Sequence, residues 1–303
     1  MEKCERLVVV KNFDGSSVTW SDSFCDSAKL FNCEVVDSIA DIEKLDNYIF
    51  LGDKIPKNLG KIGCSIYFLA AADRTQQEYE NVIATSHTTT VSNSEKTAIL
   101  DKFPNINSNK ISVDGFPINL ELLNTVKKSI KLKMKKSVCF LGRTDSDKGP
   151  HEELIAVEAL KRLGYSVFHL ANCKISIYNE LSKLGAIAVE NLNGLKYLNL
   201  LATMGCVVNT SPRESLFVSG LEATGLGLPI IAPSIVNSGI NDWNLPNRFY
   251  RSGDIYNLLD IVREIELSNN IIIPSIDKYD HKAYFNRQND HFIDIRQGLC
   301  PKD

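Results

Sequence analysis

A short loop in the second half of the chain carries two cations ahead of a predicted helix. Residues 141–149 (LGRTDSDKG) follow an apolar run and include Arg143 and Lys148. A helix N-terminus attracts anions, because unpaired backbone N–H groups and the positive end of the helix dipole point outward there. Arginine adds bidentate hydrogen bonds to phosphate oxygens. Basic residues are common at such junctions, but this pair indicates a clamp for a diphosphate group.

Two glutamates, Glu214 and Glu222, stand eight positions apart further along the chain. Two turns of helix take about seven residues, so the two carboxylates cannot share one turn. Glu214 is expected at the mouth of a loop, and Glu222 in the helix that follows. One carboxylate could then accept hydrogen bonds from sugar hydroxyls, and the other from a ribose diol. The spacing alone also fits two unrelated surface acids.

Alternating strands and helices must position these loops. In the second half, strands are expected at residues 138–141, 166–170, 187–189, 206–209 and 230–232, with helices at 152–163 and 195–204. In the first half, strands are expected at 7–10, 34–36, 48–51, 65–70, 88–91 and 111–113, with helices around 20–31 and from 94 onward. This alternation is typical of parallel α/β sheets, which bind ligands at the carboxyl ends of their strands.

The fold class we predict is therefore α/β, with two Rossmann-like doubly wound domains facing a cleft. The predicted boundaries are 1–134 for the first domain and 135–275 for the second, which carries the motif loops. Residues 276–303 are expected to form a helical tail that packs back toward the first domain. A cleft between two such domains is the usual place for a small-molecule site.

Composition narrows the class of protein. The 303 residues are 44% hydrophobic and 23% charged, with a net charge of −3, which is typical of a packed globular chain. A dedicated nucleic-acid binder usually carries a basic excess, and this chain does not. The eight cysteines show no C-x-x-C or His-Cys spacing, no signal-peptide core follows Met1, and no apolar run reaches the ~20 residues of a membrane span. We expect a cytoplasmic protein with reduced cysteines.

The stretch 120–136 is expected to begin as a helix and becomes strongly basic. Its lysines are Lys127, Lys128, Lys131, Lys133, Lys135 and Lys136. One interpretation is a solvated helix and linker ahead of the second domain. The other is a contact for an anionic partner such as phosphate or DNA. The sequence leaves both open.

In combination, the motifs of the second half resemble glycosyltransferase family four, a large family of retaining enzymes with the GT-B fold. That family carries Gly-Arg, Lys-Gly, Pro-Ser-x-x-Glu, a second glutamate after seven further residues, and Gly-x-Pro before a strand. The matching positions are Gly142-Arg143, Lys148-Gly149, Ser211-Pro212 with Glu214 and Glu222, and Gly227-Leu228-Pro229. The match spans residues 137–265. The first half is only compatible, through Gly15 in a glycine loop and Val113-Asp114-Gly115 in a turn.

The resemblance implies a metal-independent hexosyl- or pentosyltransferase that uses a nucleotide-sugar, with a UDP-sugar expected first and no cofactor required. Its implied catalytic residues are Arg143 and Lys148 on the diphosphate and Glu214 on the sugar hydroxyls. The implied donor-binding residues are Gly15, Ser16, Gly142, Arg143, Lys148, Ser215, Leu216, Phe217 and Glu222, the last of these on the ribose. Retention in this fold is described as front-face attack, without a protein nucleophile.

Two departures from the family pattern affect the expected substrates. Phe217 stands where a glycine would let backbone amides approach the sugar, so the donor sugar is expected to be unusual or differently posed. The family often has a histidine after a strand of the first domain. Here that position leads into Asp73 and Arg74, which become the acceptor-side candidates, and nearby His87 is expected to be an ordinary loop histidine.

Two alternatives concern the chemistry. Asp145-Ser146-Asp147 is a D-x-D motif, typical of the Mg²⁺ or Mn²⁺ site of the GT-A fold. Because Arg143 and Lys148 flank it and already supply positive charge, we expect no metal. The second alternative is a catalytically inactive nucleotide-binding scaffold, against which the intact set of basic and acidic motif residues argues.

A further alternative concerns the acceptor. The chain is also similar, in short scattered matches, to phage DNA α-glucosyltransferases that modify hydroxymethylcytosine. The matches are Gly142-Arg143-Thr144, Lys148-Gly149, Ser215-Leu216, Leu221-Glu222 and the tail residues Gln288, Asp290 and Phe292. DNA is thus a candidate acceptor, with Lys128, Lys131 and Lys135 as phosphate contacts and the host cytoplasm as location. A glycan, lipid or small-molecule acceptor stays open, as does the oligomeric state.

Overall fold

The computed structural model divides the chain into two compact units. The first comprises Met1–Asn119 with Asp277–Asp303, and the second comprises Leu120–Ile276. The described residues are 7–11, 19–37, 47–51, 64–69, 76–171, 173–190, 192, 194–212, 214–215, 217–235, 248–268 and 270–297. Within them, no helix combines the length and apolar character needed to cross a membrane.

Among the described residues, the first unit has six parallel strands in the order β2-β1-β3-β4-β5-β6. These are β1 Leu7–Lys11, β2 Glu34–Val36, β3 Asn47–Leu51, β4 Ser65–Leu69, β5 His87–Thr90 and β6 Ile111–Val113. Its helices are α1 Thr19–Leu30, α2 Gln76–Ala84, α3 Asn93–Lys102 and α11 His281–Arg296, with 3-10 turns η3 Ser108–Lys110 and η5 Asp277–Tyr279. Each strand expected in the first half overlaps one of these strands.

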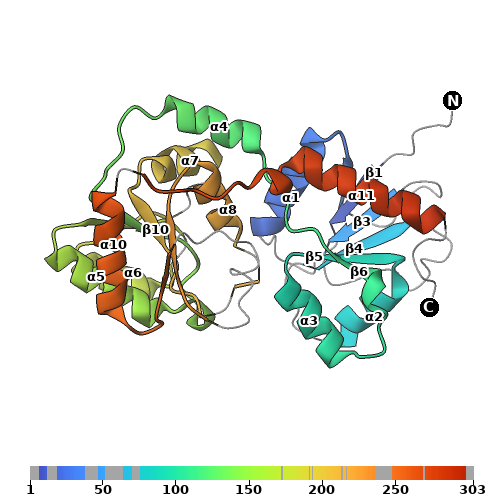
Figure 1. Cartoon of the computed structure of the whole chain (residues 1–303), viewed down its shortest axis with the longest axis horizontal. Helices are drawn as coiled ribbons and strands as arrows, with labels where there is room; N and C mark the ends of the chain where they lie inside the picture. The colour runs from blue at the N-terminus through green and yellow to red at the C-terminus, as the bar shows by residue number, and fades with distance from the viewer. Residues whose placement is uncertain are drawn as a thin grey trace. The chain divides into compact units, whose positions relative to one another are not determined.

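The core of the first unit joins the two ends of the chain. Every residue of β3 and β4 is buried, as a parallel sheet covered on both faces requires. Phe24 of α1 lies 4.8 Å, between ring centroids, from Phe68 of β4 and 5.7 Å from Phe285 of α11. Figure 1 shows α11, the last helix of the chain, alongside α1 and the strands of this unit.

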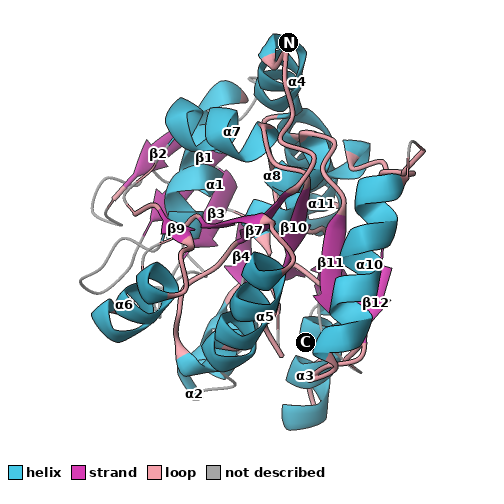
Figure 2. Ribbon diagram, turned by 90° about the vertical axis from the view of Figure 1, so that its left-hand side faces the viewer, coloured by secondary structure: helices cyan, strands magenta, loops and turns pink. Residues whose placement is uncertain are grey.

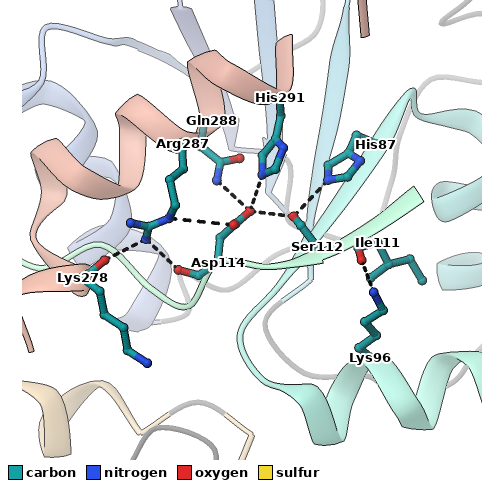
Figure 3. Close-up of polar contacts among 9 residues, drawn as sticks. All are labelled: His87, Lys96, Ile111, Ser112, Asp114, Lys278, Arg287, Gln288 and His291. Atoms are coloured by element: carbon teal, nitrogen blue, oxygen red, sulfur yellow. Dashed lines mark hydrogen bonds and ion pairs between the residues drawn. The ribbon is translucent and has the colours of Figure 1, made fainter. Parts of the chain in front are cut away.

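A buried carboxylate fixes α11 to the end of β6. Asp114 accepts hydrogen bonds from Gln288 at 3.1 Å, His291 at 3.0 Å and Ser112 at 2.6 Å, and Arg287 donates to its backbone oxygen at 3.0 Å (Figure 3). Burial alone would raise the pKa of Asp114, but the hydrogen bonds from His291 and Ser112 hold this pKa well below its ordinary value. The tail from Asp277 onward therefore belongs to the first unit.

His87 was expected in a loop, and this expectation is wrong. It is the first residue of β5, and its side chain is buried. Its ring stacks on that of His291 with centroids 4.5 Å apart, and Nε2 lies 2.9 Å from the Ser112 hydroxyl (Figure 3). Burial, with His291 next, lowers the pKa of His87 to about 4, so the ring is neutral at pH 7. His87 is thus part of the contact between β5 and α11.

The second unit also has six parallel strands within the described ranges, in the order β12-β11-β10-β7-β8-β9. These are β7 Ser137–Phe140, β8 Ser166–His169, β9 Ile187–Ala188, β10 Cys206–Val208, β11 Ile230–Pro233 and β12 Arg248–Tyr250. Its helices are α4 Leu120–Ser129, α5 Pro150–Arg162, α6 Ile175–Lys183, α7 Gly194–Ala202, α8 Val218–Gly225 and α10 Ile255–Leu267, with the turn η4 Ser146–Lys148. The sequence did not predict β12.

Helices α5 and α10 pack side by side over one face of the second sheet (Figure 2). Their apolar residues and those of the strands form one buried cluster, which includes Val157, Leu160, Val262, Phe140 and Val208. Figure 2 also shows α7 and α8 among the remaining helices of this unit, and both contact α4. The strands that carry the predicted loops are therefore held rigidly in this core.

The division into units differs from the predicted boundaries at residues 134 and 135. Helix α4 ends at Ser129 and groups with the second unit. It packs closely on α8, since a Cβ built on Gly225 would lie 2.5 Å from Cδ1 of Leu123. The sequence placed this helix in the first domain because its hydrophobic pattern does not reveal which sheet it covers.

Candidate functional site

The two predicted motif loops leave adjacent strands at one edge of the second sheet. Strand β7 pairs in parallel with β10, with Phe140 opposite Val208. The strand order runs through β8 and β9 on one side of this pair and through β11 and β12 on the other. The pair is thus a topological switch point, where doubly wound sheets bind ligands outside the carboxyl ends of the strands.

A glycine lets the two loops touch. Gly149 has φ +68°, and a Cβ built on it would lie 2.2 Å from the Thr210 carbonyl oxygen. Any side chain there would meet backbone that cannot move aside. The Thr210 hydroxyl donates to the Lys148 carbonyl at 3.3 Å, and the Ser211 hydroxyl donates to the Asp147 carbonyl at 3.3 Å. Backbone proximity and side-chain hydrogen bonds therefore tie the 142–149 loop to the 209–214 loop.

Lys148 and Glu214 meet at this junction. The Lys148 ammonium lies 3.0 Å from Oε2 of Glu214, and the two side chains are 19% and 5% exposed. Asn209 donates from Nδ2 to the other carboxylate oxygen of Glu214 at 3.3 Å, and its own Oδ1 accepts from the Ser211 backbone N–H at 2.7 Å. The carboxylate is consequently held in one orientation, with a cation beside it.

Arg143 belongs to a separate ion pair. Its Nη1 lies 2.8 Å from one oxygen of Asp145, and Lys174 Nζ lies 3.2 Å from the other. The Arg143 side chain is 69% exposed, so most of its guanidinium faces solvent. The Lys174 backbone N–H also donates to the Thr144 hydroxyl at 2.7 Å, which fixes the 142–145 segment. Arg143 and Lys148 thus engage different carboxylates of this edge, Asp145 and Glu214.

The arrangement around Asp145 bears on the D-x-D alternative. The Asp145 carboxylate lies between two cations, and this environment repels a divalent metal ion. No group of three or more His, Cys, Asp or Glu side chains with the geometry of a metal site occurs among the described residues.

A buried ion pair lies beneath the first turn of α5. His169, the last residue of β8, places Nδ1 2.6 Å from Oε1 of Glu153, and both side chains are buried. Burial opposes the charged imidazole, but hydrogen bonds with Cys173 and Glu153 raise the pKa of His169 to about 10. The α5 N-terminus, with Pro150 at its first position, is therefore fixed relative to β8.

Glu222 lies in α8, as its spacing predicted, and its carboxylate accepts a hydrogen bond from the Tyr197 hydroxyl of α7. Desolvation raises the pKa of Glu222 to about 7, while the Tyr197 hydrogen bond acts in the opposite direction. The titration of this carboxyl is thus shifted toward neutral pH.

Comparisons with known proteins agree with this architecture. Neither a protein-family model nor a curated protein sequence matches the chain. Among solved structures, the chain is similar to the lipopolysaccharide outer core galactosyltransferase WaaB, with a TM-score of 0.67 and 14% identity over 95% of this chain and 99% of that one. It is similar to a glycosyltransferase from Rickettsia africae ESF-5, with a TM-score of 0.68 and 12% identity over 97% and 99%. It is also similar to Anabaena Alr3699/HepE in complex with UDP-glucose, with a TM-score of 0.64 and 12% identity over 97% and 98%.

This chain has the GT-B fold. The predicted pair of doubly wound α/β domains is thereby confirmed. Lys148 and Glu214 meet at the switch point of the second unit, and Gly142 follows β7 in the same loop as Lys148. Their roles in donor binding stay a prediction. Lys174 and Asn209 were not predicted as site residues, because neither belongs to a motif. Their positions after β8 and β10 are the signal that could have pointed to them.

Of the other predicted donor-binding residues, the structure describes Ser215 and Phe217. Ser215 is half-buried beside Glu214, and Phe217 is buried. A Cβ built on Gly220 would lie 2.1 Å from the Phe217 ring, so this ring folds back onto α8. The remaining predicted donor and acceptor residues, namely Gly15, Ser16, Leu216, Asp73 and Arg74, lie outside the described residues.

The predicted acceptor lysines lie away from these loops. Lys133 Nζ is 3.4 Å from the Gly227 carbonyl oxygen, just before β11, and Lys136 lies over the Tyr165 ring, just before β8. The 131–136 segment itself leads into the first residue of β7. Because β7, β8, β10 and β11 are parallel, this segment marks their amino ends, opposite the motif loops. The structure therefore does not bring Lys131 and Lys135 to the loops, and Lys128 is at the exposed end of α4.

Proposed function

We propose that this protein transfers a sugar from a nucleotide-sugar donor to an acceptor hydroxyl, with the donor bound at the switch point of the second unit. The observation that supports this most directly is the Lys148–Glu214 pair at the carboxyl ends of β7 and β10. This pair holds a cation that could bind a phosphate next to a carboxylate that could accept hydrogen bonds from hydroxyl groups. Both lie on the GT-B fold.

The proposed roles of Lys148 and Arg143 rest on the N–H donors that their carboxylate partners leave unused. Lys148 has three N–H donors, and the Glu214 contact uses one, so the ammonium can also bind a phosphate oxygen. Arg143 keeps most of its five donors free of Asp145 and faces solvent. As the donor breaks, negative charge develops on the leaving diphosphate. Fixed cations stabilise that charge more than they stabilise the ground state, and they thereby lower the barrier.

The two glutamates would bind the two parts of the donor other than the diphosphate, namely the sugar and the ribose. Glu214, held by Lys148 and Asn209, would accept hydrogen bonds from the hydroxyls of the sugar. Glu222 would exchange its Tyr197 contact for the ribose diol. A carboxylate fixed by an ammonium and an amide is a weak nucleophile. We therefore propose retention by front-face attack, in which the acceptor hydroxyl approaches on the side that the diphosphate leaves.

Metal independence is part of the proposal. Arg143 and Lys148 supply the charge that a divalent ion supplies in other sugar transferases, and Asp145 is already engaged by Arg143 and Lys174. The donor tested first should be a UDP-sugar, because the structurally similar Anabaena protein is described in complexes with UDP, with UDP-glucose, and with UDP and glucose.

A donor-hydrolysis screen tests the proposal. Nucleotide release is measured for a panel of UDP-, GDP-, ADP- and TDP-sugars, with and without hydroxymethylated DNA, for the wild type and for Lys148→Ala. The matched control is Lys183→Ala, which removes an exposed lysine whose partner is Glu180 of the same helix. Release that depends on one donor and is lost in Lys148→Ala supports the proposal. Tight binding of a nucleotide without turnover on any donor or acceptor would instead support an inactive scaffold.

A further inference from the structure

The edge of the second sheet that carries the motif loops holds the cations Arg143, Lys148 and Lys174. Lys148 is paired with Glu214 at 3.0 Å. Arg143 and Lys174 both pair with Asp145, and among the described residues neither forms an ion pair with another carboxylate. Two positive charges therefore share one negative charge. One cation of this group is left without a carboxylate of its own, and this excess charge attracts an anion.

The Asp145 carboxylate bridges its two cations with separate oxygens. Oδ2 lies 2.8 Å from Arg143 Nη1, and Oδ1 lies 3.2 Å from Lys174 Nζ. A phosphate group offers a similar arrangement, because several anionic oxygens on one atom each accept hydrogen bonds. The Asp145 side chain is 33% exposed, and the Arg143 and Lys174 side chains are 69% and 59% exposed. An anion from solvent can therefore reach both cations.

The backbone of this loop does not depend on the Asp145 side chain. Asp145 precedes the 3-10 turn η4, and its carboxylate makes no capping hydrogen bond there. The turn is closed by the backbone, since the Lys148 N–H donates to the Asp145 carbonyl at 2.9 Å. The Lys174 N–H donates to the Thr144 hydroxyl at 2.7 Å, which joins the two segments without an ion pair. The carboxylate can thus leave its two cations while both segments keep their positions.

The cations come from neighbouring strands. Arg143 follows β7, and Lys174 follows β8, which pairs in parallel with β7. Lys148 lies in the same loop as Arg143 and meets Glu214, which follows β10 on the other side of β7. Lys174 therefore extends the cations from the β10 side of β7 to the β8 side. A diphosphate, with two linked anionic groups, suits this row better than the single charge of one carboxylate.

We propose that Asp145 competes with the donor diphosphate for Arg143 and Lys174, and that Lys174 binds the diphosphate together with Arg143 once Asp145 is displaced. This inference rests on the proposed function, because it concerns the same donor site. A diphosphate carries more than one negative charge, so it neutralises both cations where Asp145 neutralises one. The contacts of Asp145 must be broken first, and their loss reduces the net affinity for the donor.

Calorimetric titration of the full chain with UDP, in EDTA and at low salt, tests this competition. Asp145→Asn keeps the side-chain volume and removes the charge, so it should bind UDP about three- to tenfold more tightly than the wild type. A carboxylate that only held the loop together would give the opposite sign, because its loss would loosen the loop. The control Asp260→Asn removes the same charge from an exposed pair with Arg263 in α10, and it should leave the UDP affinity unchanged.

Lys174→Gln tests the second part of the proposal. This variant should bind UDP about fivefold more weakly than the wild type. The loss should be larger in the Asp145→Asn background, where no carboxylate competes for Lys174. The control Lys183→Gln removes an exposed lysine of α6 that pairs with Glu180, and it should bind UDP like the wild type. Thermal unfolding of these variants should stay close to that of the wild type, since the ion pairs concerned are exposed.

The possible results distinguish a failure of this inference from a failure of the proposed function. If Lys148→Ala abolishes UDP binding but Asp145→Asn leaves the affinity unchanged or lowers it, the donor site is retained and the inference is overturned. An equal gain in affinity in Asp260→Asn would overturn it too, because net charge alone would then explain the effect. So would equal UDP binding by Lys174→Gln and Lys183→Gln. If the wild type binds none of UDP, GDP, ADP and TDP, both the proposed function and the inference fail.

Discussion

The Lys148 ammonium lies 3.0 Å from the Glu214 carboxylate, although the two residues are 66 positions apart in the chain. The parallel pairing of β7 with β10 creates this contact, since it places the ends of both strands at the same edge. Gly149 then lets the loops approach to van der Waals contact. Each residue of the pair thus has a clear physical reason to be where it is, and the pair can be tested as a unit.

Lys148→Ala should fold but lose most turnover. Loss of a charge-assisted contact that strengthens in the transition state raises the activation free energy by about 2 to 4 kcal/mol. This lowers kcat/KM roughly 30- to 1,000-fold. Glu214→Gln keeps the side-chain volume but replaces one accepting oxygen with an N–H donor, so it removes the charge together with one of the contacts to Lys148 and Asn209. In a double-mutant cycle, the combined variant should lose less than the sum of the single losses, because the groups act together. If the losses of the two single variants simply add up in the double variant, Lys148 and Glu214 contribute to catalysis independently.

Arg143→Ala should affect catalysis with little effect on stability. The side chain is 69% exposed and its partner Asp145 keeps Lys174, so the free energy of unfolding should change by less than about 0.5 kcal/mol. Turnover should fall about 10- to 100-fold if the guanidinium binds the diphosphate. Arg143→Lys retains the charge but not the bidentate geometry, so its turnover should lie between those of the wild type and Arg143→Ala. Wild-type kinetics in Arg143→Ala would remove this residue from the clamp.

Gly149→Ala should loosen the junction between the two loops. The substitution combines a left-handed φ of +68° with a Cβ 2.2 Å from the Thr210 carbonyl oxygen. Gly253 provides a matched control, because its φ is +80° and a built Cβ meets nothing within 4 Å. Gly253→Ala should cost about 1 to 2 kcal/mol of stability from the backbone conformation alone. Gly149→Ala should cost more and should also weaken UDP binding, which calorimetry would measure. Equal effects of the two substitutions would contradict the predicted steric contact.

The sequence could predict the strands and the motif loops because apolar strands and motif spacing are local properties. It could not predict which carboxylate each cation meets. The register of β7 with β10 brings Lys148 to Glu214, and Lys174 joins Arg143 on Asp145. Such partners depend on tertiary packing, which motif spacing does not contain. The clamp of Arg143 and Lys148 on one diphosphate stays a prediction.

The strand predicted at 88–91 overlaps β5, but the first residue of β5, His87, was wrongly expected in a loop. Strand β5 reads His-Thr-Thr-Thr, and all four side chains are buried without any apolar alternation. The β-propensity of threonine was the one local clue to this strand. The His87 ring stacks on His291 of α11, which is 204 positions further along the chain. A local sequence pattern around His87 could not predict this contact.

Turnover should persist in excess EDTA. The proposed donor site uses Arg143 and Lys148 as its cations, and Asp145 of the D-x-D motif is already paired with Arg143 and Lys174. Initial rates with the preferred nucleotide-sugar should be equal with and without the chelator, and added Mg²⁺ or Mn²⁺ should have little effect. Loss of activity on chelation, restored by Mn²⁺, would instead place a metal in the mechanism.

The affinity for the donor should depend on the ionisation of Glu222. Desolvation raises the pKa of this carboxyl to about 7, above the ordinary value of 4.5. If the ionised form accepts the ribose diol, UDP affinity should fall as pH decreases through 7. Glu222→Gln should remove this dependence. Tyr197→Phe removes a hydrogen bond that lowers the pKa of Glu222, so the midpoint should move to higher pH.

Stability should show the opposite trend, which makes the two effects separable. A carboxyl whose pKa is raised in the folded state stabilises the fold fully below pH 4.5, and this contribution is lost as pH rises through 7. Glu222→Gln should therefore have a higher Tm than the wild type at pH 8 but not at pH 4. Calorimetric UDP titrations and thermal unfolding across this range measure both trends. A wild-type UDP affinity that stays constant from pH 6 to pH 8 would exclude Glu222 as the ribose ligand, whatever the unfolding data show.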